Sequence, residues 1–157
     1  MRHPRKGFSL IELIAVCTIV GILMLMAVPR FRVMRESYSV QAARHQLAAA
    51  VAATRSAAVQ KGRRARFRTD GNVFSAVVDT SATDSIFVIP PTDVGEQFGV
   101  TLEVRAGDDS VLTFDPRGFR TTPRSAAMQR YVVRRGASID SLCVGMLGQL
   151  LPPGCRL

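Results

Sequence analysis

Histidine, cysteine and lysine are scarce in this 157-residue chain, and the scarcity narrows what the protein can do. The two histidines are His3 and His45, and neither has a cysteine or another histidine at metal-ligand spacing. The chain also lacks a G-x-S-x-G motif, a P-loop and a G-x-G-x-x-G motif. We therefore expect no catalytic centre, no metal site and no cofactor.

The overall composition excludes a wholly disordered chain and a protein that crosses a membrane many times. Hydrophobic residues make up 47% of the chain and charged residues 21%, as in folded domains. The length supports one domain with at most an appended element. The formal net charge is +9, and only Lys6 and Lys61 are lysines. Such an arginine-rich excess favours an anionic partner, either nucleic acid or a membrane.

The longest apolar run covers residues 8–28, and its only charged residue is Glu12. As a helix the run would be about 31 Å long, close to the roughly 30 Å thickness of a bilayer core. Arg2, Arg5 and Lys6 precede it, and basic residues before a first span place the N-terminus in the cytoplasm. We therefore expect a single-pass anchor in the cytoplasmic membrane, with the remaining chain outside.

A secretory signal peptide is the main alternative, and it predicts a soluble protein whose mature N-terminus lies near Arg30. The apolar stretch of a signal peptide is only about 7–15 residues long and ends at a small-residue cleavage site. Here the run is longer, and the sequence A-V-P-R at residues 27–30 is a poor site. A carboxylate at mid-membrane costs about 2.5 kcal/mol or more, so Glu12 is expected to have a partner. Otherwise its side chain reaches the headgroups.

Residues 7–13, G-F-S-L-I-E-L, resemble the G-F-[ST]-L-[IL]-E signature of type IV prepilins and type II secretion pseudopilins. The resemblance implies that a prepilin peptidase cuts between Gly7 and Phe8 and N-methylates Phe8. It implies that Glu12 neutralises the new α-amino group of a neighbouring subunit, since paired buried charges cost less than isolated ones. It also implies a helix kink at Pro29. The implied partners are other pilin or pseudopilin subunits, the prepilin peptidase, the inner-membrane assembly platform and the cytoplasmic membrane.

The helix is expected to continue beyond Pro29 to about Lys61. Val40, Leu47, Val51 and Ala58 recur at spacings of seven and four, which places them in one apolar stripe. Beyond Gly62 the pattern alternates, as in strands. The expected strands are residues 64–69, 72–79, 85–89, 99–105, 111–115, 129–134 and 139–144. Turns are expected at 70–71, 90–91 (two prolines), 106–109 and 116–118.

This order of elements predicts an α+β chain with a type IV pilin-like fold. A long N-terminal helix, half in the membrane and half amphipathic, would pack on a mostly antiparallel sheet or on two small sheets. The expected parts are a leader at 1–7 that is removed, a transmembrane or filament-core helix at 8–29, its amphipathic continuation at 30–62, and a globular β domain at 63–157. Without the leader the chain has 18 basic and 12 acidic residues, a net charge of +6.

Three patches, residues 52–62, 112–118 and 145–156, resemble minor pseudopilins of the GspH/FimT group. The resemblance implies a structural minor subunit of a type II secretion pseudopilus or a type IV pilus, supporting protein secretion or pilus biogenesis. Cys17 lies in the apolar run, where a small hydrophobic residue is ordinary. Cys143 and Cys155 are expected to form a disulfide, because the compartment outside the cytoplasmic membrane is oxidising. Two buried free thiols are the alternative.

Arginines gather in two groups. The first is Arg63, Arg64, Arg66 and Arg68, and the second is Arg117, Arg120 and Arg124. In a strand that begins at Arg64, alternate residues share a face, and guanidinium groups bind phosphate well. A DNA receptor for natural transformation, as on the FimT side of the group, is therefore the alternative function. The G-R-x-R-type motif of those receptors is absent from residues 148–151. A solvated surface with local ion pairs is the simpler interpretation.

Overall fold

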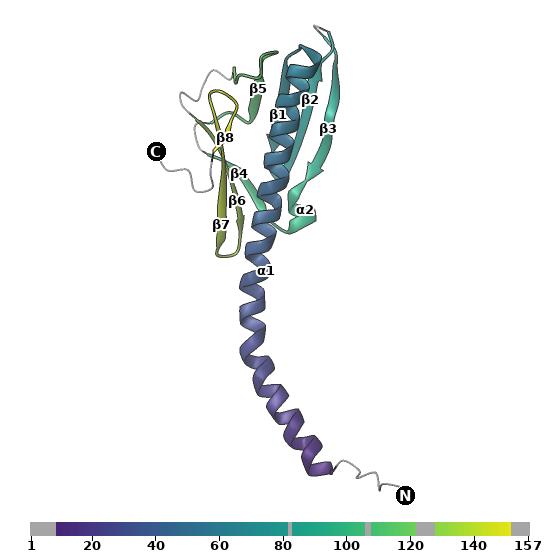
Figure 1. Cartoon of the computed structure of the whole chain (residues 1–157), viewed down its shortest axis with the longest axis vertical. Coiled ribbons are helices and arrows are strands. Elements are labelled where there is room, and N and C mark those ends of the chain that lie inside the picture. Colours follow the sequence, from purple (N-terminus) through teal and green to yellow (C-terminus); the bar gives the residue numbers. More distant parts are fainter. Residues whose placement is uncertain (1–8, 82, 106–107, 122–127, 152–157) are drawn as a thin grey trace, which may run out of the picture. The chain divides into compact units, whose positions relative to one another are not determined.

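The computed structural model in Figure 1 describes residues 9–81, 83–105, 108–121 and 128–151, except for the side chains of residues 26–29. The chain divides into two compact units, Met1–Arg35 and Glu36–Leu157. We describe each unit by itself.

Helix α1 (Leu10–Lys61) is the first element, and it supplies one wall of the core of the second unit. Val40, Leu47, Val51 and Ala58 are at most 2% exposed, so the predicted stripe is confirmed. The helix ends at Gly62, whose φ of 61° is in the left-handed region. The backbone N–H of Arg63 donates to the carbonyl of Ala58, a bond typical of helices that end on a glycine.

The strands form two antiparallel sheets. Sheet A has the order β3-β2-β1-β5 and sheet B the order β4-β6-β7-β8. Sheet A contains β1 (Ala65–Asp70), β2 (Val73–Asp79), β3 (Ser85–Asp93) and β5 (Val111–Phe114). Sheet B contains β4 (Thr101–Val104), β6 (Met128–Arg135), β7 (Ser138–Gly145) and β8 (Leu150–Leu151). The α+β class and the antiparallel pairing agree with the prediction.

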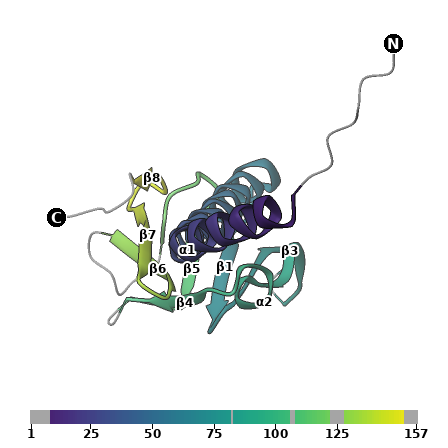
Figure 2. The same ribbon diagram turned by 90° about the horizontal axis from the view of Figure 1, so that it is seen from below.

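One hydrophobic core joins the second part of α1 to both sheets and to the short helix α2 (Val94–Phe98). Figure 2 shows the strands of both sheets around α1. At the centre, the rings of Phe67 and Phe74 stack at 5.7 Å, and Tyr131 meets Phe67 edge-on at the same distance. All three rings are at most 1% exposed. The contact between Phe67 of sheet A and Tyr131 of sheet B therefore helps to hold the two sheets together.

The expected turn at Pro90 and Pro91 is wrong, because β3 continues through both prolines to Asp93. Proline cannot donate a backbone hydrogen bond, but an edge strand leaves half of its donors unused. β3 is the last strand of sheet A, and this position accommodates the two prolines.

Two short elements, α2 and β8, were not expected from the sequence. Asp93 caps α2, since its side chain accepts from the backbone N–H groups of Gly95 and Glu96. Asp93 and Glu96 have the spacing of a capping box, which is a signal that the sequence contained. β8 has only two residues and exists because the chain reverses at residues 145–148 to pair with β7.

The turn after β5 is tied to α1. Asp115 Oδ1 accepts from the backbone N–H groups of Arg117 and Phe119, at 2.9 and 2.8 Å. Gly118 has a φ of 83°, and its carbonyl accepts a 3.0 Å hydrogen bond from Nε of Arg55. The sequence F-D-P-R-G thus forms a turn whose glycine contacts the helix.

Candidate assembly segment and arginine surfaces

The first part of α1 presents apolar side chains that the chain itself does not cover. Leu10, Ile11 and Leu25 are 75–79% exposed, and the side chains described from 10 to 25 are all exposed. A continuous exposed apolar surface indicates contact with lipid or with another protein. We call residues 10–25 the assembly segment.

Glu12 lies in the first turn of α1, within the assembly segment. Its backbone N–H donates to the carbonyl of Ser9, and its side chain is exposed. A carboxylate in the first turn is favourable because the helix dipole is positive there. Glu12 is therefore available to a partner from another molecule. Gly7 and Phe8, the predicted cleavage and methylation residues, lie outside the described residues.

By length and composition, no single helix in the described part of the chain qualifies as a membrane span. Leu10–Leu25 and Arg30–Lys61 qualify only together, as a bent pair. Pro29 is one of the residues whose side chains are not described, and the kink there remains a prediction.

The two cysteines among the described residues differ in state. Cys17 is a free, exposed thiol in the assembly segment. Cys143 on β7 is fully buried and disulfide-bonded. Cys155, its predicted partner, lies outside the described residues, so the pairing of these two residues remains a prediction.

The first arginine group follows the alternation predicted for it. Ala65, Phe67 and Thr69 of β1 point into the core, while Arg66 and Arg68 are exposed together with Arg64 just before the strand. Arg66 forms a 2.6 Å ion pair with Asp79 on β2. Arg63, at the end of α1, is also exposed. The result is a basic strip, Arg63, Arg64, Arg66 and Arg68, with one member neutralised locally.

The second arginine group is dispersed by the fold. Arg117 is exposed, but Arg120 is half-buried, and its side chain donates to the carbonyl of Val144. Burial lowers the pKa of the Arg120 guanidinium, while the charge of Asp108 opposes this effect. Arg120 therefore braces the loop against β7 and presents little surface to a ligand. Arg124 lies outside the described residues.

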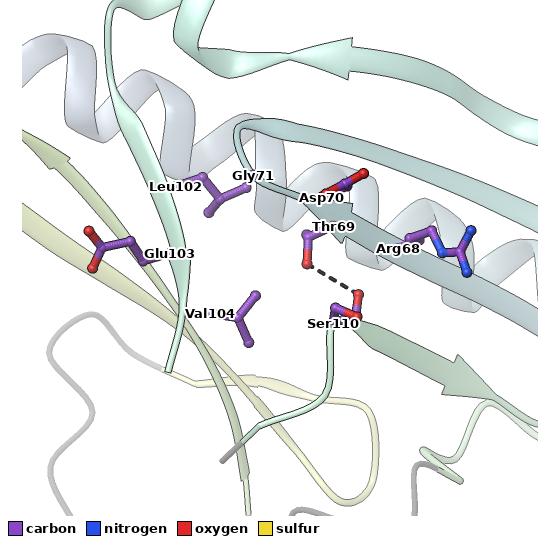
Figure 3. Close-up of a pocket in the computed structure, with 8 residues that line it drawn as sticks. All are labelled: Arg68, Thr69, Asp70, Gly71, Leu102, Glu103, Val104 and Ser110. Atoms are coloured by element: carbon purple, nitrogen blue, oxygen red, sulfur yellow. Dashed lines mark hydrogen bonds between the residues drawn. The ribbon is translucent and has the colours of Figure 1, made fainter. Parts of the chain in front are cut away.

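A groove of about 630 Å³ separates the end of β1 from β4 (Figure 3). Arg68, Asp70 and Glu103 line it, and two further lining residues are joined by a 3.1 Å hydrogen bond from Thr69 Oγ1 to the carbonyl of Ser110. Charges of both signs line the groove, so it lacks the positive potential that phosphate binding requires. In the described part of the chain, no three histidine, cysteine or acidic residues are grouped as metal ligands. His45 is exposed on α1.

Comparison with known proteins gives one match to the N-terminal residues and two matches to the fold. A family profile described as the prokaryotic N-terminal methylation motif matches residues 2–28, which contain Gly7, Phe8 and Glu12. No curated protein gives a significant match. The structure is similar to the type IV minor pilin FimU of Pseudomonas aeruginosa, in two crystal forms. In space group P21 the TM-score is 0.59 with 17% identity, over 75% of this chain and 90% of FimU.

The P65 form of FimU gives a TM-score of 0.54 with 18% identity, over 71% of this chain and 90% of the other. The fold is that of a type IV pilin. In this type IV pilin-like chain the methylation motif includes the exposed apolar part of α1, and a two-sheet domain follows. The sequence predicted the methylation motif and the basic strip at the start of β1. It missed the role of Arg120, for which the sequence held no local signal.

Proposed function

We propose that this chain is a minor pilin or pseudopilin subunit that assembles through its N-terminal helix into a type IV pilus or a type II secretion pseudopilus. The observation that carries the proposal is the assembly segment. It is apolar, it is not covered by the chain itself, and it lies within the residues that match the methylation motif. The similarity to FimU, which is described as a type IV minor pilin, supports this role.

In this proposal a prepilin peptidase removes residues 1–7 and methylates Phe8. The segment is held in the cytoplasmic membrane with the second unit outside it, until an inner-membrane assembly platform transfers the subunit to a filament. There Glu12 pairs with the terminal amine of a neighbouring pilin, because leaving either charge alone in an apolar environment is costly. The role is structural, and the chain is a substrate of an enzyme.

Processing is tested by expressing the full chain with and without a prepilin peptidase and measuring the intact mass of the membrane-bound protein. We expect loss of residues 1–7 and the addition of one methyl group only when the peptidase is present. Gly7→Val is the matched control and should retain the leader. An N-terminus near Arg30 would contradict the proposal, because it would show that the apolar segment is removed as an ordinary secretory signal peptide.

Assembly is tested by Glu12→Ala. We expect normal leader cleavage, because the cut lies between Gly7 and Phe8, but a loss of subunit from sheared filaments of at least about tenfold. Ser9→Ala, at the start of the same helix, is the control and should assemble. If Glu12→Ala and the unchanged chain enter filaments equally, charge pairing at Glu12 does not drive assembly.

The alternative function is a pilus-associated DNA receptor, and the basic strip on β1 is the observation that favours it. Three exposed arginines at alternate positions would contact successive phosphates, and each contact would make binding more sensitive to salt. A mobility-shift titration of the detergent-solubilised full chain is the test. Arg64→Gln with Arg68→Gln should reduce both affinity and salt dependence, whereas Arg134→Gln on β6 should not. No shift at low salt would eliminate the receptor function.

A further inference from the structure

A mostly apolar groove, separate from the assembly segment, lies between the last turns of α1 and strands β2 and β3. The groove has a volume of about 460 Å³. One wall comes from the last turns of α1, with Ala57 and Lys61, and the other from β2 and β3, with Val78 and the residues Ile86, Phe87 and Val88. Figure 1 shows β3 at the margin of sheet A, beside α1. The groove lies entirely within the second unit.

Two large side chains of this groove are unusually exposed. Ile86 and Phe87 are adjacent residues of β3, and each is 58% exposed. Ile86 pairs with Val78, which is buried, and Phe87 pairs with Val77. The strand thus continues the sheet beyond the area that α1 covers. Neighbouring exposed apolar side chains beside a groove mark an interaction surface.

β3 also has one backbone edge that no described strand pairs with. β3 ends sheet A and pairs only with β2 among the described strands. Pro90 and Pro91 cannot donate hydrogen bonds, so residues 85–89 are the part of the edge that can accept another strand. Five residues of extended chain span about 17 Å. An added strand of that length would place alternate side chains over the groove.

The positive charges beside the groove favour an acidic partner. Lys61 and Arg63 line it, and neither has an ion-pair partner in the described part of the chain. Asp79 also lines the groove, but it is paired with Arg66. A second copy of this chain would bring a net charge of +6 after leader removal, and like charges oppose such a contact. Carboxylates on the incoming strand would complement the two free cations.

We propose that the edge of β3 binds an extended, acidic segment of a different protein, which pairs with residues 85–89 and seats apolar side chains against Ile86 and Phe87. Nucleic acid fits less well, since the walls between the cations are aliphatic and aromatic side chains and strand edges that offer little to a phosphate. The proposal concerns the second unit alone, so it does not depend on assembly through residues 10–25.

The test uses the detergent-solubilised full chain and a fluorescein-labelled nonapeptide in which valine and phenylalanine alternate with serine at the centre and glutamates stand at both ends. Binding is measured by fluorescence anisotropy. We expect saturable binding that weakens at least about tenfold with Phe87→Ser and with the double change Lys61→Glu and Arg63→Glu. Phe119→Ser and Arg134→Glu, exposed residues outside the groove, are the matched controls and should bind within about twofold of the unchanged chain. If Phe87→Ser fails to fold, Ile86→Ser provides the same measurement.

Several results would overturn the proposal. One is equal binding of a peptide with lysine in place of glutamate, and another is undiminished binding of a peptide with proline at the central position, which cannot complete the ladder. If a single-stranded oligonucleotide displaces the peptide, and Phe87→Ser abolishes binding of that oligonucleotide, the groove is a nucleic-acid site. Self-association that depends on Phe87 in sedimentation would assign it to a second copy. No binding up to about 1 mM peptide would also reject it. Leader cleavage should be normal in every groove variant, which separates this proposal from the proposed function.

Discussion

Gly148→Ala should destabilise the β domain strongly, because Gly148 sits where another part of the backbone approaches it. Its φ is 73°, and an added Cβ would lie 2.6 Å from the carbonyl oxygen of Gly118 and 3.1 Å from Nε of Arg55. That same carbonyl accepts the 3.0 Å hydrogen bond from Arg55. The clash cannot be relieved by rotating a flexible side chain, so the backbone of the turn after β5 or of the turn between β7 and β8 must shift.

The magnitude has two parts. A left-handed backbone costs a residue with a Cβ about 1–2 kcal/mol, and overpacking a tight site costs about 1–3 kcal/mol. The sum is about 2–5 kcal/mol of unfolding free energy, against a typical total of about 5–15 kcal/mol. Gly71 is the matched control. Its φ is 56°, but an added Cβ would meet nothing within 4 Å, so Gly71→Ala should lose only the backbone part.

Thermal unfolding of the detergent-solubilised full chain tests this difference. Near-ultraviolet circular dichroism suits the measurement, because the packed rings of Phe67, Phe74 and Tyr131 belong to the β domain. At about 4 °C for each kcal/mol, Gly71→Ala should lower the midpoint by about 4–8 °C and Gly148→Ala by about 8–20 °C. If the two variants melt within about 2 °C of each other, the contact with Gly118 does not constrain the domain.

Three further perturbations probe buried groups. Burial, with a smaller contribution from Asp108, raises the pKa of Tyr131 above its ordinary value. The folded state therefore retains the phenol proton more tightly, so its stability is complete below about pH 10 and declines as pH rises. Tyr131→Phe should remove that decline in urea titrations at about pH 8 and pH 11, and an unchanged slope would refute the assignment. Asp140→Asn breaks the 3.6 Å ion pair with Arg44. The side chain of Arg44 is only 14% exposed and that of Asp140 only 20%. The unfolding free energy measured by urea denaturation should fall by about 1–3 kcal/mol. Asp79→Asn, at the more exposed pair with Arg66, should lower it by only about 0–1 kcal/mol. Equal losses would show that burial does not strengthen the ion pair. Reducing the disulfide at Cys143 should lower stability by about 2–3 kcal/mol in a Cys17→Ser background, and the shift should vanish when Cys143 is replaced by serine.

The helix and its stripe could be predicted from the sequence because they depend on neighbours a few residues apart. Val40, Leu47, Val51 and Ala58 share a face through the helical repeat alone. The exposure of Arg66 and Arg68 follows in the same way, since Phe67 between them must be buried and a strand alternates. The methylation motif is likewise a local pattern of residues, and the matching family profile covers it.

Tertiary structure alone decided the features that depend on distant residues. Pro90 and Pro91 are compatible with a strand only because β3 became the edge of sheet A. Arg120 is drawn inward by the carbonyl of Val144, which lies 24 positions away. Arg55 reaches Gly118 across 63 positions. No periodicity encodes such pairs, because hydrogen bonds and burial at these residues depend on which strands end side by side. Local pattern therefore determined the long helix, most of the strands and the methylation motif of this pilin-like chain, while packing determined which arginines are exposed and which strand lies at the edge of sheet A.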